Sequence, residues 1–114
     1  MRDAVAFKVL TAAELAELEA GSFAGSAADR RDGYLHLSTA AQLTATVDKH
    51  YAGQTDLHVA EVDLEPLGDA IRWEAARDGQ DFPHLYASLP LDAVVAYSPL
   101  ERDDAGQVKL PVAG

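Results

Sequence analysis

Polar side chains of catalytic type alternate with leucines along residues 34–38 of this 114-residue chain. Successive side chains of a β-strand point to opposite faces of its sheet. A strand here would therefore place the two leucines on one face and Tyr34, His36 and Ser38 on the other. We expect the leucines to enter the core, while the opposite face presents a phenol, an imidazole and a hydroxyl.

Two further segments show the same alternation. In the first, His84 and Tyr86 would project to the side opposite the leucine between them. In the second, Arg72 and Glu74 would project away from the core. If the three strands share one sheet with their polar faces on the same side, these residues line a single cleft. The two histidines would then serve as acids, bases or orienting donors, because imidazole changes its charge near neutral pH.

A helix start follows His36 closely. Residues 39–42, Thr-Ala-Ala-Gln, have the pattern of a capping box, in which Thr39 accepts a hydrogen bond from a backbone amide. The unpaired amides at a helix N-terminus favour an anion such as phosphate. An imidazole beside this helix start suits a nucleotide or a phosphorylated ligand, although Thr39 itself would use one of the amides.

Each candidate also has an ordinary structural explanation. His36 would be a half-buried histidine bonded to backbone, and His84 would pack against its aromatic neighbours. Arg72 and Glu74 would form a solvated cross-strand pair, and the two tyrosines would be amphipathic rim residues. The sequence has no H-x-x-x-H or H-x-H spacing, no G-x-S-x-G turn and no glycine-rich phosphate loop. It therefore predicts no metal site and no serine-nucleophile site.

The order of the expected elements predicts one α+β domain over residues 1–114. A capping box at residues 11–14 starts a first helix that ends near Gly21, and a second helix runs from Thr39 to about Tyr51. Residues 22–33 are expected to form a loop, and residues 111–114 a short tail. Strands are expected at 5–10, 34–38, 57–64, 71–74, 84–86, 94–97 and 108–110.

Composition restricts the classes of partner. A net charge of −10 disfavours binding to duplex DNA, which needs a basic surface. No apolar run is long enough for a membrane helix, and the chain has no cysteine. We expect no signal peptide, because residues 1–4 do not begin a basic stretch followed by an apolar core. We expect a cytoplasmic protein that binds a small molecule or nucleotide, and the sequence identifies no protein partner.

Several blocks in order along the chain resemble a bacterial family known as domain of unknown function 952. They are F-K-V-L-T-A-A-E-L, D-G-Y-L-H-L-S-T-A-A-Q-L, R-W-E, F-P-H-L-Y and L-P-L-D-A-V-V, and together they cover about residues 6–98. The resemblance implies the fold of the ADP-ribosyltransferase-like superfamily, a split β-sheet, here with two N-terminal helices. The H-L-S block is also similar to the H-V-H-L-S block of the RNA 2′-phosphotransferases in that superfamily.

This resemblance implies a nucleotide-type ligand, with NAD or ADP-ribose as a substrate or a 2′-phosphate as the group acted on. His36 and Ser38 would contact the ribose, and Tyr86 would stack on a base. Glu74 would stabilise the positive charge that develops as a glycosidic bond breaks. Lys8 stands where these enzymes usually carry a histidine or arginine that grips the nucleotide.

Three functions stay open on these residues. The first is a transferase that moves ADP-ribose or acts on a 2′-phosphate. The second is a noncatalytic module that binds a metabolite or a protein in the same cleft, which the small number of arginines favours. The third is a metal-free hydrolase in which His36 and His84 form an acid–base pair.

Overall fold

Three helices begin at the same local signal, a Ser or Thr followed by two alanines and an acid or amide. In each, the hydroxyl of the Ser or Thr accepts a hydrogen bond from the backbone amide of the fourth residue of the motif. The side chain of that fourth residue accepts a hydrogen bond from the backbone amide of the Ser or Thr. The computed structural model describes residues 2–111. It places the helices at Ala12–Glu19 (α1), Ala27–Asp32 (α2) and Ala40–His50 (α3), capped by Thr11, Ser26 and Thr39.

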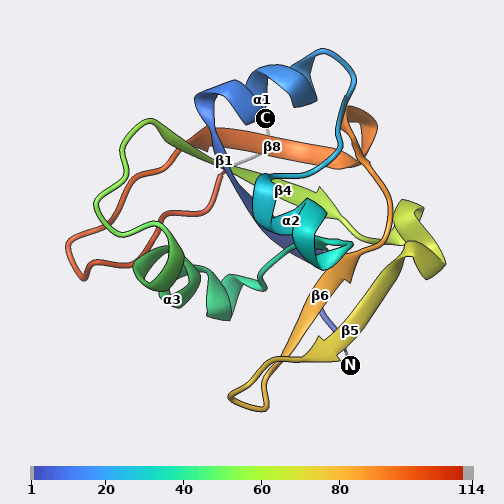
Figure 1. Ribbon diagram of the computed structural model, residues 1–114. Coiled ribbons are helices and arrows are strands. Elements are labelled where there is room, and N and C mark those ends of the chain that lie inside the picture. The colour runs from blue at the N-terminus through green and yellow to red at the C-terminus, as the bar shows by residue number, and fades with distance from the viewer. Residues whose placement is uncertain (1, 112–114) are drawn as a thin grey trace.

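The strands within residues 2–111 form three small antiparallel sheets (Figure 1). The first sheet has the order β1-β4-β8, with strands Val5–Thr11, Leu57–Asp63 and Val94–Pro99. The second pairs β2 (Ser22–Phe23) with β7 (Leu89–Pro90). The third has the order β3-β6-β5, with strands Leu35–His36, Asp81–Leu85 and Ile71–Ala75. Two 3-10 helices, Glu65–Ala70 (η1) and Leu91–Ala93 (η2), lead into β5 and β8.

The first sheet separates two apolar cores, and Figure 1 shows α1 and α3 on opposite sides of it. Along β1, Ala6 and Leu10 pack in the core that contains α1, whereas Phe7 and Val9 pack in the core that contains α3. Lys8 shares the face of Ala6 and Leu10 by alternation. Its side chain is consequently buried, although it carries a charge.

The third sheet buries one face and exposes the other. Leu35 and Leu85 are paired across β3 and β6 and belong to the core that contains α1. Beyond β3, the chain pairs with β1 through two backbone hydrogen bonds between Phe7 and Ser38, of 2.7 and 2.9 Å. The third sheet is thus attached to the first, and its polar face points away from the core.

Residues 22–33 differ from the expected loop, because they form β2 and α2. Ser26 and Asp29 make a third capping box, and Gly33, with a φ of 88°, ends α2 in the left-handed conformation. The helices are therefore interleaved with strands instead of forming an N-terminal pair. The α+β class is confirmed, as an arrangement of three small antiparallel sheets with few helices.

Two expected strands are shorter in the structure. The strand expected at 34–38 is regular only at β3, because Ser38 pairs with Phe7 on another sheet. The segment 108–110 contributes a single bridge, between Val108 and Arg102. Of the predicted tail at 111–114, residues 112–114 lie outside the described residues. Among residues 2–111, no helix has the length and hydropathy needed to cross a membrane.

Candidate functional site

The register of the third sheet aligns three of the predicted site residues in one row across the strands. His36 of β3 is paired with His84 of β6, which in turn is paired with Arg72 of β5. Directly opposite residues of an antiparallel pair project from the same face. The two imidazole centres are accordingly 5.7 Å apart. The structure thus brings together the two histidines that the sequence placed on separate segments.

Two tyrosines extend this row into a group of four rings, Tyr34, His36, His84 and Tyr86, which we call the ring cluster. Tyr34 stacks on His84, with 4.0 Å between ring centres and 20° between ring planes. Its ring centre is 4.8 Å from that of His36 and 5.2 Å from that of Tyr86. Tyr34 covers His84, whose side chain is only 10% exposed.

Glu74 is held at the edge of the ring cluster by two donors. The hydroxyl of Tyr86 donates to Glu74 Oε1 at 2.6 Å, and His84 Nδ1 donates to the same oxygen at 2.8 Å. The hydrogen bond from Tyr86, then that from His84, lowers the pKa of Glu74 below its ordinary value. The carboxylate therefore stays ionised at neutral pH, and its second oxygen, Oε2, has no bonding partner in residues 2–111.

Arg72 lies over the ring of Tyr86, with its guanidinium carbon 4.5 Å from the ring centre. This is a cation–π arrangement, which orients the guanidinium without neutralising its charge. The arginines with a carboxylate partner in residues 2–111 are Arg2, Arg31 and Arg102. The charge of Arg72 is therefore available to an anionic group near Glu74 and Tyr86.

Asp29 holds His36 from the interior. The ring Nδ1 and the backbone amide of His36 both bond Asp29 Oδ1, at 2.6 and 3.0 Å. Lys8 Nζ lies 2.9 Å from Asp29 Oδ2, and the two side chains are only 3% and 2% exposed. Burial raises the pKa of Asp29, but the hydrogen bond from His36 and the charge of Lys8 outweigh burial and lower it well below its ordinary range.

The outer nitrogen of His36, Nε2, faces a second carboxylate. Its distance to Asp32 Oδ2 is 2.9 Å. A hydrogen bond from Arg31, together with that from His36, lowers the pKa of Asp32, so both carboxylates are ionised and accept. Both ring nitrogens of His36 can donate at once only as an imidazolium. No group of three His, Asp or Glu side chains in residues 2–111 could hold a metal ion.

Three other predicted ligand-binding residues lie outside the ring cluster. Ser38 is buried, and its hydroxyl is hydrogen-bonded to that of Thr46 at 2.8 Å. The Thr39 hydroxyl caps α3 by accepting from the amide of Gln42. Lys8 is buried against Asp29 and donates to the carbonyl of His36 at 3.0 Å. Lys8 therefore supports the backbone of His36 from the core side, whereas the side chain of Ser38 connects its segment to α3.

A cavity of about 280 Å³ lies beside the ring cluster, between α2 and the chain after β6. Its lining residues with polar side chains are Asp29, Arg30, Tyr34, Tyr86 and Ser88, and the remaining ones are Ala24, Gly33, Leu35, Leu85 and Ala87. Tyr34 and Tyr86 thus belong both to the cavity and to the ring cluster. Its volume is slightly below the roughly 300–1,000 Å³ of typical small-molecule sites, and it combines apolar walls with a few polar groups.

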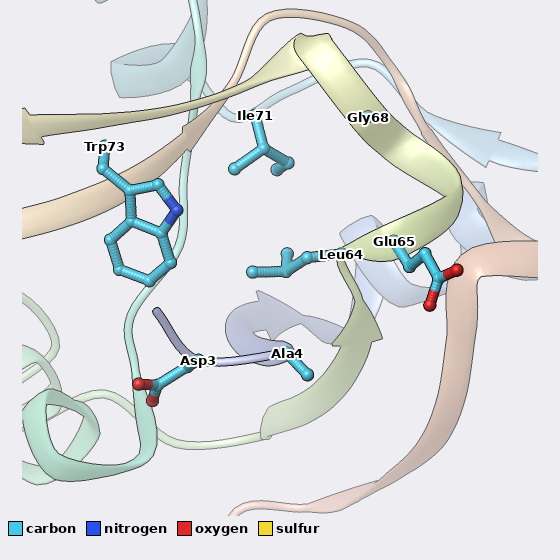
Figure 2. Close-up of a pocket in the computed structure, with 7 residues that line it drawn as sticks. All are labelled: Asp3, Ala4, Leu64, Glu65, Gly68, Ile71 and Trp73. Carbon is cyan, nitrogen blue, oxygen red and sulfur yellow. The ribbon is translucent and has the colours of Figure 1, made fainter. Parts of the chain in front are cut away.

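A second hollow of about 300 Å³ lies at the opposite face of β5 (Figure 2). Figure 2 shows Trp73, Ile71 and Leu64 turned toward this space, with Glu65 directed away from it. Ile71 and Trp73 alternate with Arg72 and Glu74 along β5, so this hollow is separated from the ring cluster by the sheet. None of the predicted site residues lines it.

Sequence reasoning missed Asp29 and Asp32, which contact Nδ1 and Nε2 of His36, respectively. They lie in α2, where a loop was expected. The signal was present, because Ser26-Ala27-Ala28-Asp29 repeats the pattern of the two capping boxes that were recognised. Asp in place of Glu or Gln at the fourth position, and a short segment without apolar periodicity, concealed it.

The chain is similar to a known protein family and to solved structures. A family model described as "Protein of unknown function (DUF952)" matches residues 9–97. The chain belongs to this family. The DUF952 match contains the ring cluster, both aspartates, Arg72 and Glu74, whereas Lys8 precedes it. No curated protein matches the chain.

Solved structures of one relative are similar over nearly the whole chain. The crystal structure of protein CC0527 from Caulobacter crescentus is 40% identical, with a TM-score of 0.83, over 92% of this chain and 93% of that chain. The solution NMR structure of the same protein is 40% identical, with a TM-score of 0.78, over 93% and 91% of the two chains. The fold is thus shared with this relative, and the family description leaves its function unassigned.

Proposed function

We propose that this protein binds a nucleotide-type ligand (NAD, ADP-ribose or a 2′-phosphate) at the ring cluster and acts on it as a transferase. One observation carries the proposal. Four rings gather on one face of the third sheet, beside a cavity and an arginine, Arg72, that forms no ion pair within residues 2–111. Bases stack on aromatic side chains, and guanidinium groups bind phosphate. The cluster combines both kinds of group.

Each residue of the site would contact a different part of the ligand. Tyr86, which is exposed, would stack on a base, with Tyr34 beside it. His36 would hydrogen-bond the ribose or its phosphate, because its ring is the most accessible imidazole of the cluster. Arg72 would bind a phosphate next to Tyr86. The remaining histidine, His84, is covered and acts as an orienting donor to Glu74.

Glu74 supplies the catalytic charge in this proposal. Two donors hold Oε1, so the free Oε2 can face a ribose whose glycosidic bond is breaking. The bond's electrons leave with the base, and positive charge develops on the sugar. A fixed carboxylate stabilises that charge without reorganising. This role requires Glu74 to be ionised, which its lowered pKa provides.

The proposal includes the architecture of the ADP-ribosyltransferase-like superfamily. The support for it is the division into the β1-β4-β8 and β3-β6-β5 sheets, joined by the Phe7–Ser38 pairing, as a split sheet requires. The H-L-S sequence at residues 36–38 lies at this junction. Ser38 would support the backbone of His36 there.

A noncatalytic binding module on the same fold is the second candidate. It is favoured by Lys8, which is buried in its pair with Asp29 and cannot grip a nucleotide as the corresponding residue of the resembling enzymes does. A hydrolase with His36 and His84 as an acid–base pair is less favoured, since Tyr34 covers His84.

The binding test uses melting temperature and Trp73 fluorescence during titration with NAD, ADP-ribose and a 2′-phosphorylated oligonucleotide. A ligand at 100 times its dissociation constant should stabilise the protein by about 2.7 kcal/mol. Tyr86→Ala should abolish most of that shift. Tyr97→Ala is the matched control, because Tyr97 is also exposed and also donates to a surface glutamate, Glu19, but lies on β8.

Glu74→Gln then separates binding from chemistry. If NAD binds, the variant should keep its affinity within about twofold and lose nicotinamide release by about 100-fold, the usual effect of removing one electrostatic group from a transition state. Binding without any nicotinamide release or phosphate transfer would select the noncatalytic module. Absence of a shift with all three ligands would remove the nucleotide-type function.

A further inference from the structure

His36 is held between two carboxylates that differ in how firmly they are fixed. Asp29, at Nδ1, is buried and bonded to Lys8 and to the backbone. Asp32, at Nε2, is 32% exposed, and its other partner is the exposed guanidinium of Arg31. The inner contact is therefore part of the packed structure, whereas the outer one is a surface contact of the kind that contributes little to stability.

Asp32 also occupies an unfavourable position on its helix. It is the last residue of α2, directly before Gly33. The C-terminal end of a helix carries partial negative charge, which disfavours a carboxylate. The contacts with His36 and Arg31 compensate for this, so Asp32 is stabilised there by the cations and not by the helix.

We infer that the Nε2–H of His36 is the position that receives the anionic group of the ligand, a phosphate, and that the carboxylate of Asp32 occupies this position and is displaced on binding. The inference rests on the proposed nucleotide-type site and adds where the negative charge of the ligand binds. Asp32 shows the geometry, with an anionic oxygen 2.9 Å from Nε2. Tyr34, 4.8 Å from His36 between ring centres, would contact the adjoining sugar or base.

Displacement keeps both ring nitrogens of His36 hydrogen-bonded throughout. The phosphate oxygen replaces Asp32 Oδ2 as the acceptor of Nε2–H, while Asp29 continues to accept from Nδ1. The released carboxylate turns to solvent, which its exposed position allows. Asp32 thereby lowers the apparent affinity, because a ligand binds only the fraction of molecules in which Nε2 is open.

The test is a double-mutant cycle at Asp32 and His36, with dissociation constants for ADP-ribose and for inorganic phosphate from calorimetry or NMR titration. Asp32→Asn should lower both constants by about three- to tenfold, by enlarging the open fraction. In the His36→Ala background the same substitution should have no effect, because the side chain at position 36 then offers no donor to a phosphate. Asp48→Asn is the charge-matched control, since Asp48, on α3, is an exposed carboxylate that is also paired with an arginine, Arg102.

The outcomes separate this inference from the proposed function. Tightening by Asp32→Asn that disappears with His36→Ala supports it. Equal effects of Asp32→Asn and Asp48→Asn, or the same tightening in both backgrounds, overturn it while leaving the nucleotide site in place. If ADP-ribose binds neither the wild type nor any variant, the proposed function fails. The titration with inorganic phosphate then shows by itself whether His36 binds an anion. Asp32→Ala, with its melting temperature, repeats the measurement if Asp32→Asn folds poorly.

Discussion

The carboxylate of Asp29 accepts hydrogen bonds from four nitrogen atoms, on Lys8, Ser26 and, twice, His36. These contacts join three elements, β1, α2 and β3, at one buried point. An isolated buried charge would be costly, and the ammonium of Lys8 and the ring of His36 compensate for it. The orientation of His36 toward the surface thus depends on a residue whose side chain is only 2% exposed.

Asp29→Asn should destabilise the protein by about 3 kcal/mol or more, because it leaves the Lys8 charge buried without a partner. Urea denaturation gives the free energy of unfolding. Asp48→Asn, at an exposed pair, should change it by less than about 0.5 kcal/mol. Similar small effects of the two substitutions would contradict the structural role of Asp29.

The pair itself is tested by adding Lys8→Met. Each single substitution removes one partner, but the double variant removes both charges. The double variant should therefore be less destabilised than the sum of the two single variants. Strict additivity would mean that Lys8 and Asp29 act independently.

Among the elements, α2 supplies both carboxylates that contact the ring of His36, and it is the helix that sequence reasoning missed. The helices α1 and α3 could be predicted because apolar residues follow their capping boxes at helical spacing. The six residues of α2 contain no such pattern, so its helix depends on Ser26, Asp29 and Gly33 and on contacts from distant parts of the chain.

The faces of the strands were more predictable than their lengths. Alternation correctly assigned Leu35 and Leu85 to the core and His36 and His84 to the other side, because a buried face restricts which residues can occupy it. The pairing of β3 with β6 could not be derived, since register between distant strands is set by tertiary packing. The roles of the site residues stay predictions.

Ser26→Ala should weaken ligand binding as well as the fold, since Ser26 and Asp29 cap each other. Loss of a helix cap costs about 1 kcal/mol. Thr11→Ala removes the equivalent cap of α1 and should cost a similar amount. Melting temperatures should fall alike, but the dissociation constant of the ligand should rise, roughly threefold or more, for Ser26→Ala alone. Equal affinities of the two variants would show that α2 does not position the site.

At the scale of the whole molecule, the side chains of Lys8, Asp29, His36 and Asp32 form a hydrogen-bonded network. It lies between the β1-β4-β8 and β3-β6-β5 sheets, which share the core that contains α1. The net charge of −10 disfavours anions in general, so an anionic ligand needs the local cations Arg72 and Arg30 and the hydrogen-bond donor of His36. The network also couples folding to pH. Its buried member, Asp29, has a lowered pKa in the folded protein and an ordinary value in the unfolded chain.

The stabilisation from Asp29 should therefore be complete above its unfolded pKa, near 4, and decrease as pH falls toward the lower folded pKa. Urea denaturation from pH 7 to pH 2 checks this for the wild type and Asp29→Asn. The difference between their free energies of unfolding should be constant down to about pH 5 and then shrink. A difference that is independent of pH would contradict an ionised Asp29.

The two backbone bonds between Phe7 and Ser38 have a consequence for the dynamics of the molecule. Each residue's amide proton is donated to the other's carbonyl across the junction of two sheets. Deuterium from solvent can reach either proton only when the sheets separate there. Both amides should therefore show the same protection factor once each rate is divided by the intrinsic exchange rate of that amide. This factor measures the free energy of opening the junction, regardless of which sheet loosens first.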